Sequence, residues 1–177
     1  ALAAMVAVLS HTKKGFEDSH QELDRIAVRA QELKDLQLAA VDADTAAFDA
    51  LLDAMRMPKV TAEEKSARSK AMADATVGAA EIPLRVLEAC PEIIDLCRDV
   101  ARIGMQASLS DAGVGAQVAR AAAAGAYQNA CINLAGLKGD DPRKASLLQR
   151  ADAAWDRSRE LHAKAEEEIL VRLRQEA

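Results

Sequence analysis

The chain has 177 residues, enough for one domain with a substantial buried core. Half of the residues are hydrophobic but only 2% are aromatic, so small and aliphatic side chains must fill the interior. The formal net charge of −5, with both signs mixed along the chain, argues against a nucleic-acid binder, which normally carries a basic excess. The three cysteines have no metal-type spacing and cannot all pair, which favours a reducing, cytoplasmic location.

The first expected helix ends near residues 10–12, before Lys13-Lys14-Gly15. Its apolar stretch, residues 1–9, is too short to span a bilayer, so no membrane segment is expected. The chain opens without a methionine or a helix-start signal, and we therefore expect the beginning of this helix to be missing.

A long second helix is expected to begin at Ser19, because Ser19 and Glu22 have the spacing of a capping box. Helical spacing of apolar residues continues from there to Met57. Pro58 cannot donate a backbone hydrogen bond and is expected to end this helix.

A third helix is expected to begin at a second capping box, formed by Thr61 and Glu64. Pro83 falls inside its apolar pattern and should kink or break the helix, because proline removes a donor and clashes one turn back. Pro91 is then expected to start a further helical piece that runs to Gly104.

Either Ser110 or Asp111 is expected to cap the next helix, which is rich in small residues and ends around residues 134–136. Asp141 followed by Pro142 predicts a cap and a first helical residue for a last, charged helix that runs almost to Ala177. Strand signals are nearly absent. Residues 1–177 are therefore predicted to form one all-α domain, an antiparallel bundle of long helices.

Two carboxylates lie inside an apolar helical pattern in the segment 41–48. Asp44 aligns at helical spacing with four apolar residues: Val41, Phe48, Leu51 and Met55. We therefore expect Asp44 to face the core, whereas Asp42 falls on a mixed and wetter face. A buried acid is either tied to a cation for structure alone or tuned for proton transfer.

Two pairs of polar residues have both a structural and a functional interpretation. Ser110 and Asp111, followed by two glycines, form either an ordinary helix cap or a helix start that receives an anion or a carbonyl oxygen. Asn129 and Asn133 lie one turn apart, so their amides either join helices or donate hydrogen bonds to a polar ligand.

Lys13 and Lys14, close to His11, form a small basic cluster at a helix end. They either complement the helix dipole in solvent or anchor a polyanionic ligand tail. The sequence has no catalytic triad, no phosphate loop and no metal cluster, so no metal is expected.

Several short segments occur in the order and at the spacing of one protein family. They are residues 3–6, 10–16, 41–48, 57–59, 61–65, 110–114 and 125–134. The chain resembles the formiminotetrahydrofolate cyclodeaminase and methenyltetrahydrofolate cyclohydrolase family, which includes the cyclodeaminase half of formiminotransferase-cyclodeaminase. No single motif is long, but together they extend the resemblance over nearly the whole chain.

The resemblance implies an all-helical domain that forms a homodimer or higher oligomer, with a folate site in a crevice near the dimer interface. It implies a cyclodeaminase of histidine degradation, in which folate N10 attacks the formimino carbon on N5, ammonia leaves and 5,10-methenyltetrahydrofolate remains. The family's catalytic aspartate corresponds to Asp44. Substrate contacts are expected from Lys13, Lys14, Ser110, Asp111, Asn129 and Asn133.

The resemblance implies that tetrahydrofolate, with or without a polyglutamate tail, carries the reacting group. It also implies a formiminotransferase as a partner, either fused to this domain or associated with it. The family normally begins with a proline- and glycine-rich turn, of which the chain has nothing. It also has Gly104-Met105 where the family tends to have Gly-Asn, which puts specificity in doubt if that asparagine contacts substrate. The alternatives are a methenyltetrahydrofolate cyclohydrolase, in which water attacks the bridging carbon, and a non-catalytic helical assembly module.

Overall fold

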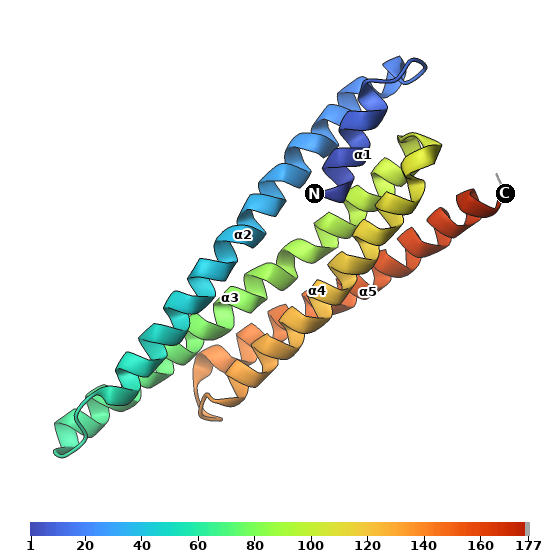
Figure 1. Ribbon diagram of the computed structural model, residues 1–177. Helices are drawn as coiled ribbons and strands as arrows, with labels where there is room; N and C mark the ends of the chain where they lie inside the picture. Colours follow the sequence, from blue (N-terminus) through green and yellow to red (C-terminus); the bar gives the residue numbers. More distant parts are fainter. Residues whose placement is uncertain (176–177) are drawn as a thin grey trace.

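Helical spacing of apolar residues extends along almost the whole chain, and the computed structural model contains five α-helices and two short 3₁₀ turns (Figure 1). In chain order they are α1 (Leu2–His11), η1 (Glu17–Ser19), α2 (His20–Arg56), α3 (Ala62–Ile103), η2 (Gln106–Ser108), α4 (Leu109–Ala135) and α5 (Pro142–Gln175). The structure describes residues 1–175, so the expected end of the last helix towards Ala177 lies outside the described residues. Within residues 1–175 there is no strand, and no helix is both long and apolar enough to cross a membrane. The all-α prediction is confirmed.

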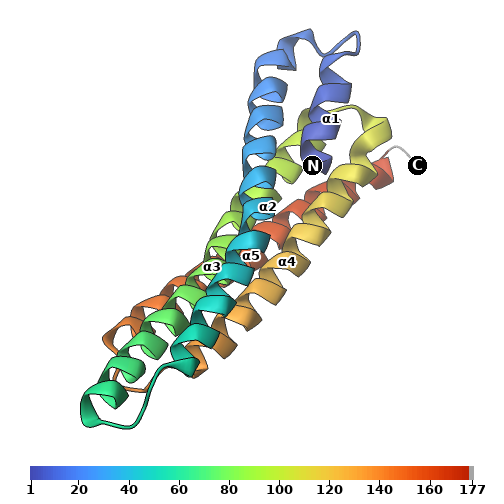
Figure 2. The ribbon, with the colours of Figure 1, turned by 60° about the vertical axis from the view of Figure 1, so that its left-hand side comes forward.

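The four long helices run alternately up and down, with α3 at the centre of the bundle (Figures 1 and 2). Helix α3 packs against α2, α4 and α5, and the short α1 packs chiefly against α2 and α4. One end of the bundle holds the turns from α1 to α2 and from α3 to α4, and the opposite end holds the turns from α2 to α3 and from α4 to α5 (Figure 2). The expected antiparallel bundle is therefore present.

The second half of α2 takes little part in the buried core. One core cluster contains α2 residues only from Leu23 to Leu33, together with residues of α1, α3, α4 and α5. The other cluster, at the opposite end of the bundle, is built from α3, α4, α5 and the turn that follows α4, with no residue of α2. Beyond Leu33, the one buried residue of α2 is Ala54.

The two predicted capping boxes have different outcomes. At Thr61 the box is complete, because Glu64 N donates to Thr61 Oγ1 (3.2 Å) and Thr61 N donates to a Glu64 carboxylate oxygen (3.1 Å). At Ser19 the helix begins as predicted, but the box is wrong: Ser19 has helical backbone angles (φ −102°, ψ −2°) at the end of a 3₁₀ turn. An N-cap side chain normally needs an extended backbone, and Glu22 pairs with Arg25 instead (2.6 Å).

Helix α4 begins one to two residues before the predicted caps. Its N-cap is Ser108, so Ser110 and Asp111 lie in the first helical turn, and the capping role predicted for them is wrong. The reason is η2, whose 3₁₀ turn already curves the chain into the helix direction. At the start of α5 the prediction is confirmed, since Asp141 Oδ1 accepts a hydrogen bond from Arg143 N (3.0 Å).

Helix α3 runs without a break through both of its prolines, so of the two alternatives expected at Pro83, a kink or a break, the break is wrong, and so is the new segment expected at Pro91. Proline at position 83 leaves the carbonyl of Ala79, one turn earlier, without its helical donor. Asn133 of α4 supplies the replacement, because its Nδ2 donates to Ala79 O at 2.9 Å. A neighbouring helix thus satisfies the group that proline frees, and α3 continues as one helix of 42 residues.

We predict that Asn133→Ala lowers the free energy of unfolding by about 1–2 kcal/mol, because Ala79 O loses its donor in a partly buried position. In a Pro83→Ala background the cost should be smaller, since residue 83 then donates its own N–H to that carbonyl. Urea unfolding of wild type, Asn133→Ala, Pro83→Ala and the double variant gives the four free energies of a double-mutant cycle. An equal cost of Asn133→Ala in both backgrounds would show that the two residues are not coupled.

His162 of α5 is only 6% exposed, and its Nε2 has no hydrogen-bond partner within the described residues. Burial lowers the pKa of His162 from the usual 6.5; Glu166 opposes this shift and Arg120 adds to it. Below pH 6.5 the unfolded chain therefore takes up a proton that the folded chain resists, and stability falls as the pH falls.

We expect His162→Leu to weaken the loss of stability between pH 7.5 and pH 5.5, by at most about 1.4 kcal/mol per pH unit for a single proton. Urea unfolding of wild type and variant at several pH values measures the difference. Parallel pH profiles for the two proteins would contradict the assignment.

Candidate functional site

Asp44 is exposed in the single chain, so the prediction that it faces the core is wrong. The apolar residues aligned with it are open as well: Val41 is 64%, Phe48 59% and Met55 46% exposed. The pattern correctly groups these residues on one apolar face, but the rest of the chain leaves that face exposed. Within residues 1–175 no Lys, Arg or His forms an ion pair with Asp44, which removes the interpretation of a structural acid tied to a cation of its own chain.

Asp44 lines a cavity of about 400 Å³ between α2, α3 and α4, which we call the carboxylate cavity. Helix α4 contributes Asn129, and α2 contributes Gln37, which lies seven residues before Asp44 on the same helical face. Pro83 and other apolar side chains of α3 form the floor. Asp42 is exposed and is not part of this lining, so the two aspartates have separate environments as expected.

The amides in this cavity have defined orientations. Gln37 Nε2 donates to the carbonyl of Val86 (3.3 Å), which leaves its amide oxygen available as an acceptor. Asn133 Nδ2 is directed at Ala79 O and also lies 3.4 Å from Asn129 Oδ1, so the NH₂ group of Asn129 remains as a donor. Asn133 thus joins two helices, whereas Asn129 lines the cavity with its NH₂ group free of a partner within residues 1–175.

Sequence reasoning did not select Gln37 or Pro83. The signal for Gln37 was present, because it precedes Asp44 by two helical turns on the same face. Pro83 was interpreted only as a helix breaker, and nothing in the sequence indicated that its ring would form a wall of the cavity.

The remaining predicted site residues lie at the other end of the bundle. Lys13 and Lys14 are exposed in the turn before α2, and 24 residues of α2 between His20 and Asp44 correspond to about 36 Å. Ser110 and Asp111 are separated from Asn129 by about 28 Å of helix α4. A single chain therefore brings Asp44 and Asn129 together but leaves the other four residues far away.

Two features of the predicted motifs serve packing. A Cβ at Gly115 would lie 2.9 Å from Cys97 Sγ, so this glycine permits the close approach of α4 to α3. The buried hydroxyl of Ser10 donates to Val6 O (2.7 Å) and accepts from Met105 N (2.8 Å), which ties α1 to the turn before α4.

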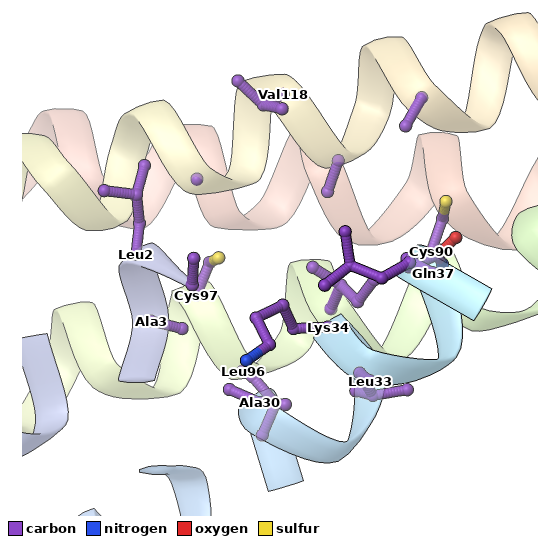
Figure 3. A pocket seen from close by; sticks show the side chains of 16 residues that line it. Leu2, Ala3, Ala30, Leu33, Lys34, Gln37, Cys90, Leu96, Cys97 and Val118 are labelled. Carbon is purple, nitrogen blue, oxygen red and sulfur yellow. The ribbon is translucent and has the colours of Figure 1, made fainter. Parts of the chain in front are cut away.

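Figure 3 shows a second cavity, of about 480 Å³. It adjoins the carboxylate cavity and shares Gln37 and Ala122 with it. Its walls are mostly aliphatic and also contain Cys90 and Cys97. Burial raises the pKa of both thiols to about 11, so both are protonated at neutral pH and are poor nucleophiles. Of the two cavities, the carboxylate cavity has the more polar lining.

The formiminotransferase-cyclodeaminase family model matches residues 1–153. A methenyltetrahydrofolate cyclohydrolase of Methylorubrum extorquens is 34% identical over 137 residues, which cover 77% of this chain and 66% of the relative. The formimidoyltransferase-cyclodeaminase of Sus scrofa is 33% identical over 150 residues, which cover 85% of this chain and 28% of the relative. The chain thus spans just under two thirds of the bacterial relative and less than a third of the animal one.

The fold has a solved counterpart. A crystal structure of formiminotetrahydrofolate cyclodeaminase from Thermotoga maritima superposes with a TM-score of 0.83 at 21% identity, covering 95% of this chain and 79% of that chain. At this identity the likeness is one of fold. The match to the family model over most of the sequence leads to the assignment: the chain belongs to the formiminotransferase-cyclodeaminase family.

Proposed function

We propose that the protein is a folate-dependent cyclodeaminase that converts 5-formiminotetrahydrofolate to 5,10-methenyltetrahydrofolate and ammonia. The observation that carries this proposal is the Asp44 carboxylate, which has no ion-pair partner within residues 1–175 and lines a cavity that also contains two side-chain amides. Family membership supplies the substrate class. The formimino group would come from a transferase that acts in histidine degradation.

The reaction needs a group that can both accept and release a proton. When N10 of the folate attacks the carbon of the protonated formimino group on N5, N10 must lose its proton, and the resulting amino nitrogen must gain one to depart as ammonia and leave the methenyl cation. One carboxylate can take the first proton and deliver it to the leaving nitrogen, so the two transfers balance. We assign this role to Asp44, which shares its cavity with the NH₂ of Asn129 and the oxygen of Gln37, and these two groups would orient the reacting nitrogens.

Cyclohydrolase activity is the second candidate, because the relative from Methylorubrum extorquens carries that name. In that reaction the same carboxylate would remove a proton from the water that attacks the bridging carbon of 5,10-methenyltetrahydrofolate. A non-catalytic assembly module is the alternative of another class. Side-by-side assays with both folates separate the three possibilities.

The proposal includes a homodimer formed through the open face of α2 and α4. Exposed apolar residues flank the carboxylate cavity on both helices, among them Leu38 (61%), Phe48 (59%), Val118 (60%) and Ile132 (71%). A patch of this kind is typical of an interface. A second copy on this face would exclude water from Asp44, and an antiparallel arrangement is what would bring the distant Lys13 and Lys14 of one copy towards the cavity of the other.

We predict that Asp44→Asn lowers turnover by about 10²-fold or more, the scale of a lost general acid–base group, without lowering stability, because Asp44 is exposed. Asp42→Asn, two residues away on another face, is the matched control and should keep its activity. Ammonia release and methenyl-folate absorbance measure turnover, and urea unfolding measures stability. Normal turnover of Asp44→Asn with altered stability or assembly would favour the assembly module.

We also predict that Phe48→Asp converts a wild-type dimer into a monomer, because it places a charge in the apolar face that the second copy would cover. Val60→Asp, at a site that is 83% exposed in the turn after α2, should leave the assembly unchanged. Light scattering coupled to size-exclusion chromatography gives both masses. A monomeric wild type, or a dimer that survives Phe48→Asp, would contradict this interface.

A further inference from the structure

The side chain of Asn133 forms two hydrogen bonds through one nitrogen. Its Nδ2 donates to Ala79 O at 2.9 Å and to Asn129 Oδ1 at 3.4 Å, and an amide NH₂ group has the two hydrogens that this requires. The Ala79 carbonyl can only accept, and Pro83 leaves it without a helical donor. The nitrogen of Asn133, and not its oxygen, is therefore held between α3 and Asn129.

Asn133 itself does not line the carboxylate cavity, whereas Asn129, one helical turn earlier on α4, does. The Asn129 side chain is exposed, and within residues 1–175 its contact with Asn133 is the one side-chain hydrogen bond that it forms. The amide of an exposed asparagine turns about its terminal torsion at little cost, so without this contact it would present either end. The contact thus selects the orientation of the Asn129 amide.

The other polar side chains of the cavity offer acceptors. The ionised Asp44 carboxylate only accepts hydrogen bonds, and the NH₂ group of Gln37 is engaged by Val86 O, which leaves its oxygen. Among the described residues of this lining, Asn129 is therefore the side chain with an unengaged donor.

The proposed reaction creates an acceptor for such a donor. In the protonated formimino group, the lone pairs of N5 and of the amino nitrogen are delocalised onto the carbon between them. When N10 attacks, this carbon becomes tetrahedral and the lone pairs localise on their nitrogens. A donor aimed at one of these nitrogens stabilises the transition state more than the bound substrate, and so raises kcat. Addition of water to 5,10-methenyltetrahydrofolate localises nitrogen lone pairs in the same way.

We propose that Asn133 is a positioning residue, which orients Asn129 so that its NH₂ group donates to a folate nitrogen whose lone pair localises beside Asp44. This inference rests on the proposed function. Asn133 does not touch the folate in this arrangement and acts through Asn129 alone. Its bond to Ala79 O gives it a structural role as well, so the test must separate the two roles.

Steady-state kinetics of the whole protein, with 5-formiminotetrahydrofolate and with 5,10-methenyltetrahydrofolate, gives the first measurement. Asn129→Leu removes the donor and should lower kcat about tenfold, less than the loss of a donor to a full oxyanion, because a nitrogen lone pair carries no full charge. Asn133→Ala frees the Asn129 amide to turn and should lower kcat about fivefold. KM should change less than about twofold in both variants, since the bound substrate does not use the donor.

A double variant separates positioning from stability. In Asn129→Leu/Asn133→Ala, kcat should be no lower than in Asn129→Leu, because Asn133 has no other route to the reaction. In a Pro83→Ala background, residue 83 supplies its own N–H to Ala79 O. Asn133→Ala should there cost less stability by urea unfolding but still lower kcat about fivefold relative to Pro83→Ala.

The matched control is Gln117→Ala, which removes another interhelical hydrogen bond of α4, the bond of 2.8 Å from Gln117 to Glu166 of α5, and should leave kcat unchanged. A normal kcat of Asn133→Ala, a raised KM with normal kcat, or a further fivefold loss in the double variant would overturn the positioning role. If wild type turns over either folate, these results remove that role alone. A wild type that turns over neither folate removes the proposed function with it.

Discussion

The continuity of helix α3 is the constraint on which the rest of the structure depends, and at Pro83 the hydrogen bond from Asn133 to the carbonyl of Ala79 supports it. Without a replacement donor, Pro83 would leave a hydrogen-bonding group unsatisfied in the middle of the helix against which α2, α4 and α5 all pack. Helix α3 is continuous over 42 residues, through both of its prolines, and its apolar side chains form the floor of the carboxylate cavity.

Local signals predicted the fold well, because helix content and most helix ends depend on residues close in sequence. Thr61 with Glu64 and Asp141 with Pro142 are examples in which neighbouring residues are sufficient. The capping box predicted at Ser19 is absent because the 3₁₀ turn before it sets the backbone angles of Ser19. The break considered at Pro83 is also absent, and the donor that replaces the lost N–H lies 50 residues later in the chain. No local pattern contains that information.

The candidate site was predicted in part, for a related reason. Helical spacing groups Asp44 and its apolar neighbours on one helical face, but a face that packs inside the chain and a face that the chain leaves exposed produce the same pattern. Asn129 and Asn133 were indistinguishable in sequence, and only the position of Ala79 O separates the helix-joining amide from the one in the cavity. The carboxylate cavity combines residues from three separate helices, which sequence spacing cannot bring together.

The contact between Asn133 and Asn129 links the carbonyl freed by Pro83 to the lining of the carboxylate cavity. An amide has a donor end and an acceptor end, and the Ala79 carbonyl fixes which end of Asn133 faces α3. Asn129 must then present its oxygen to Asn133 and its NH₂ to the cavity. The carbonyl that Pro83 frees thus sets, through two successive amides, the hydrogen-bonding polarity of the cavity wall beside Asp44, so a residue buried within one helix orients a donor on another.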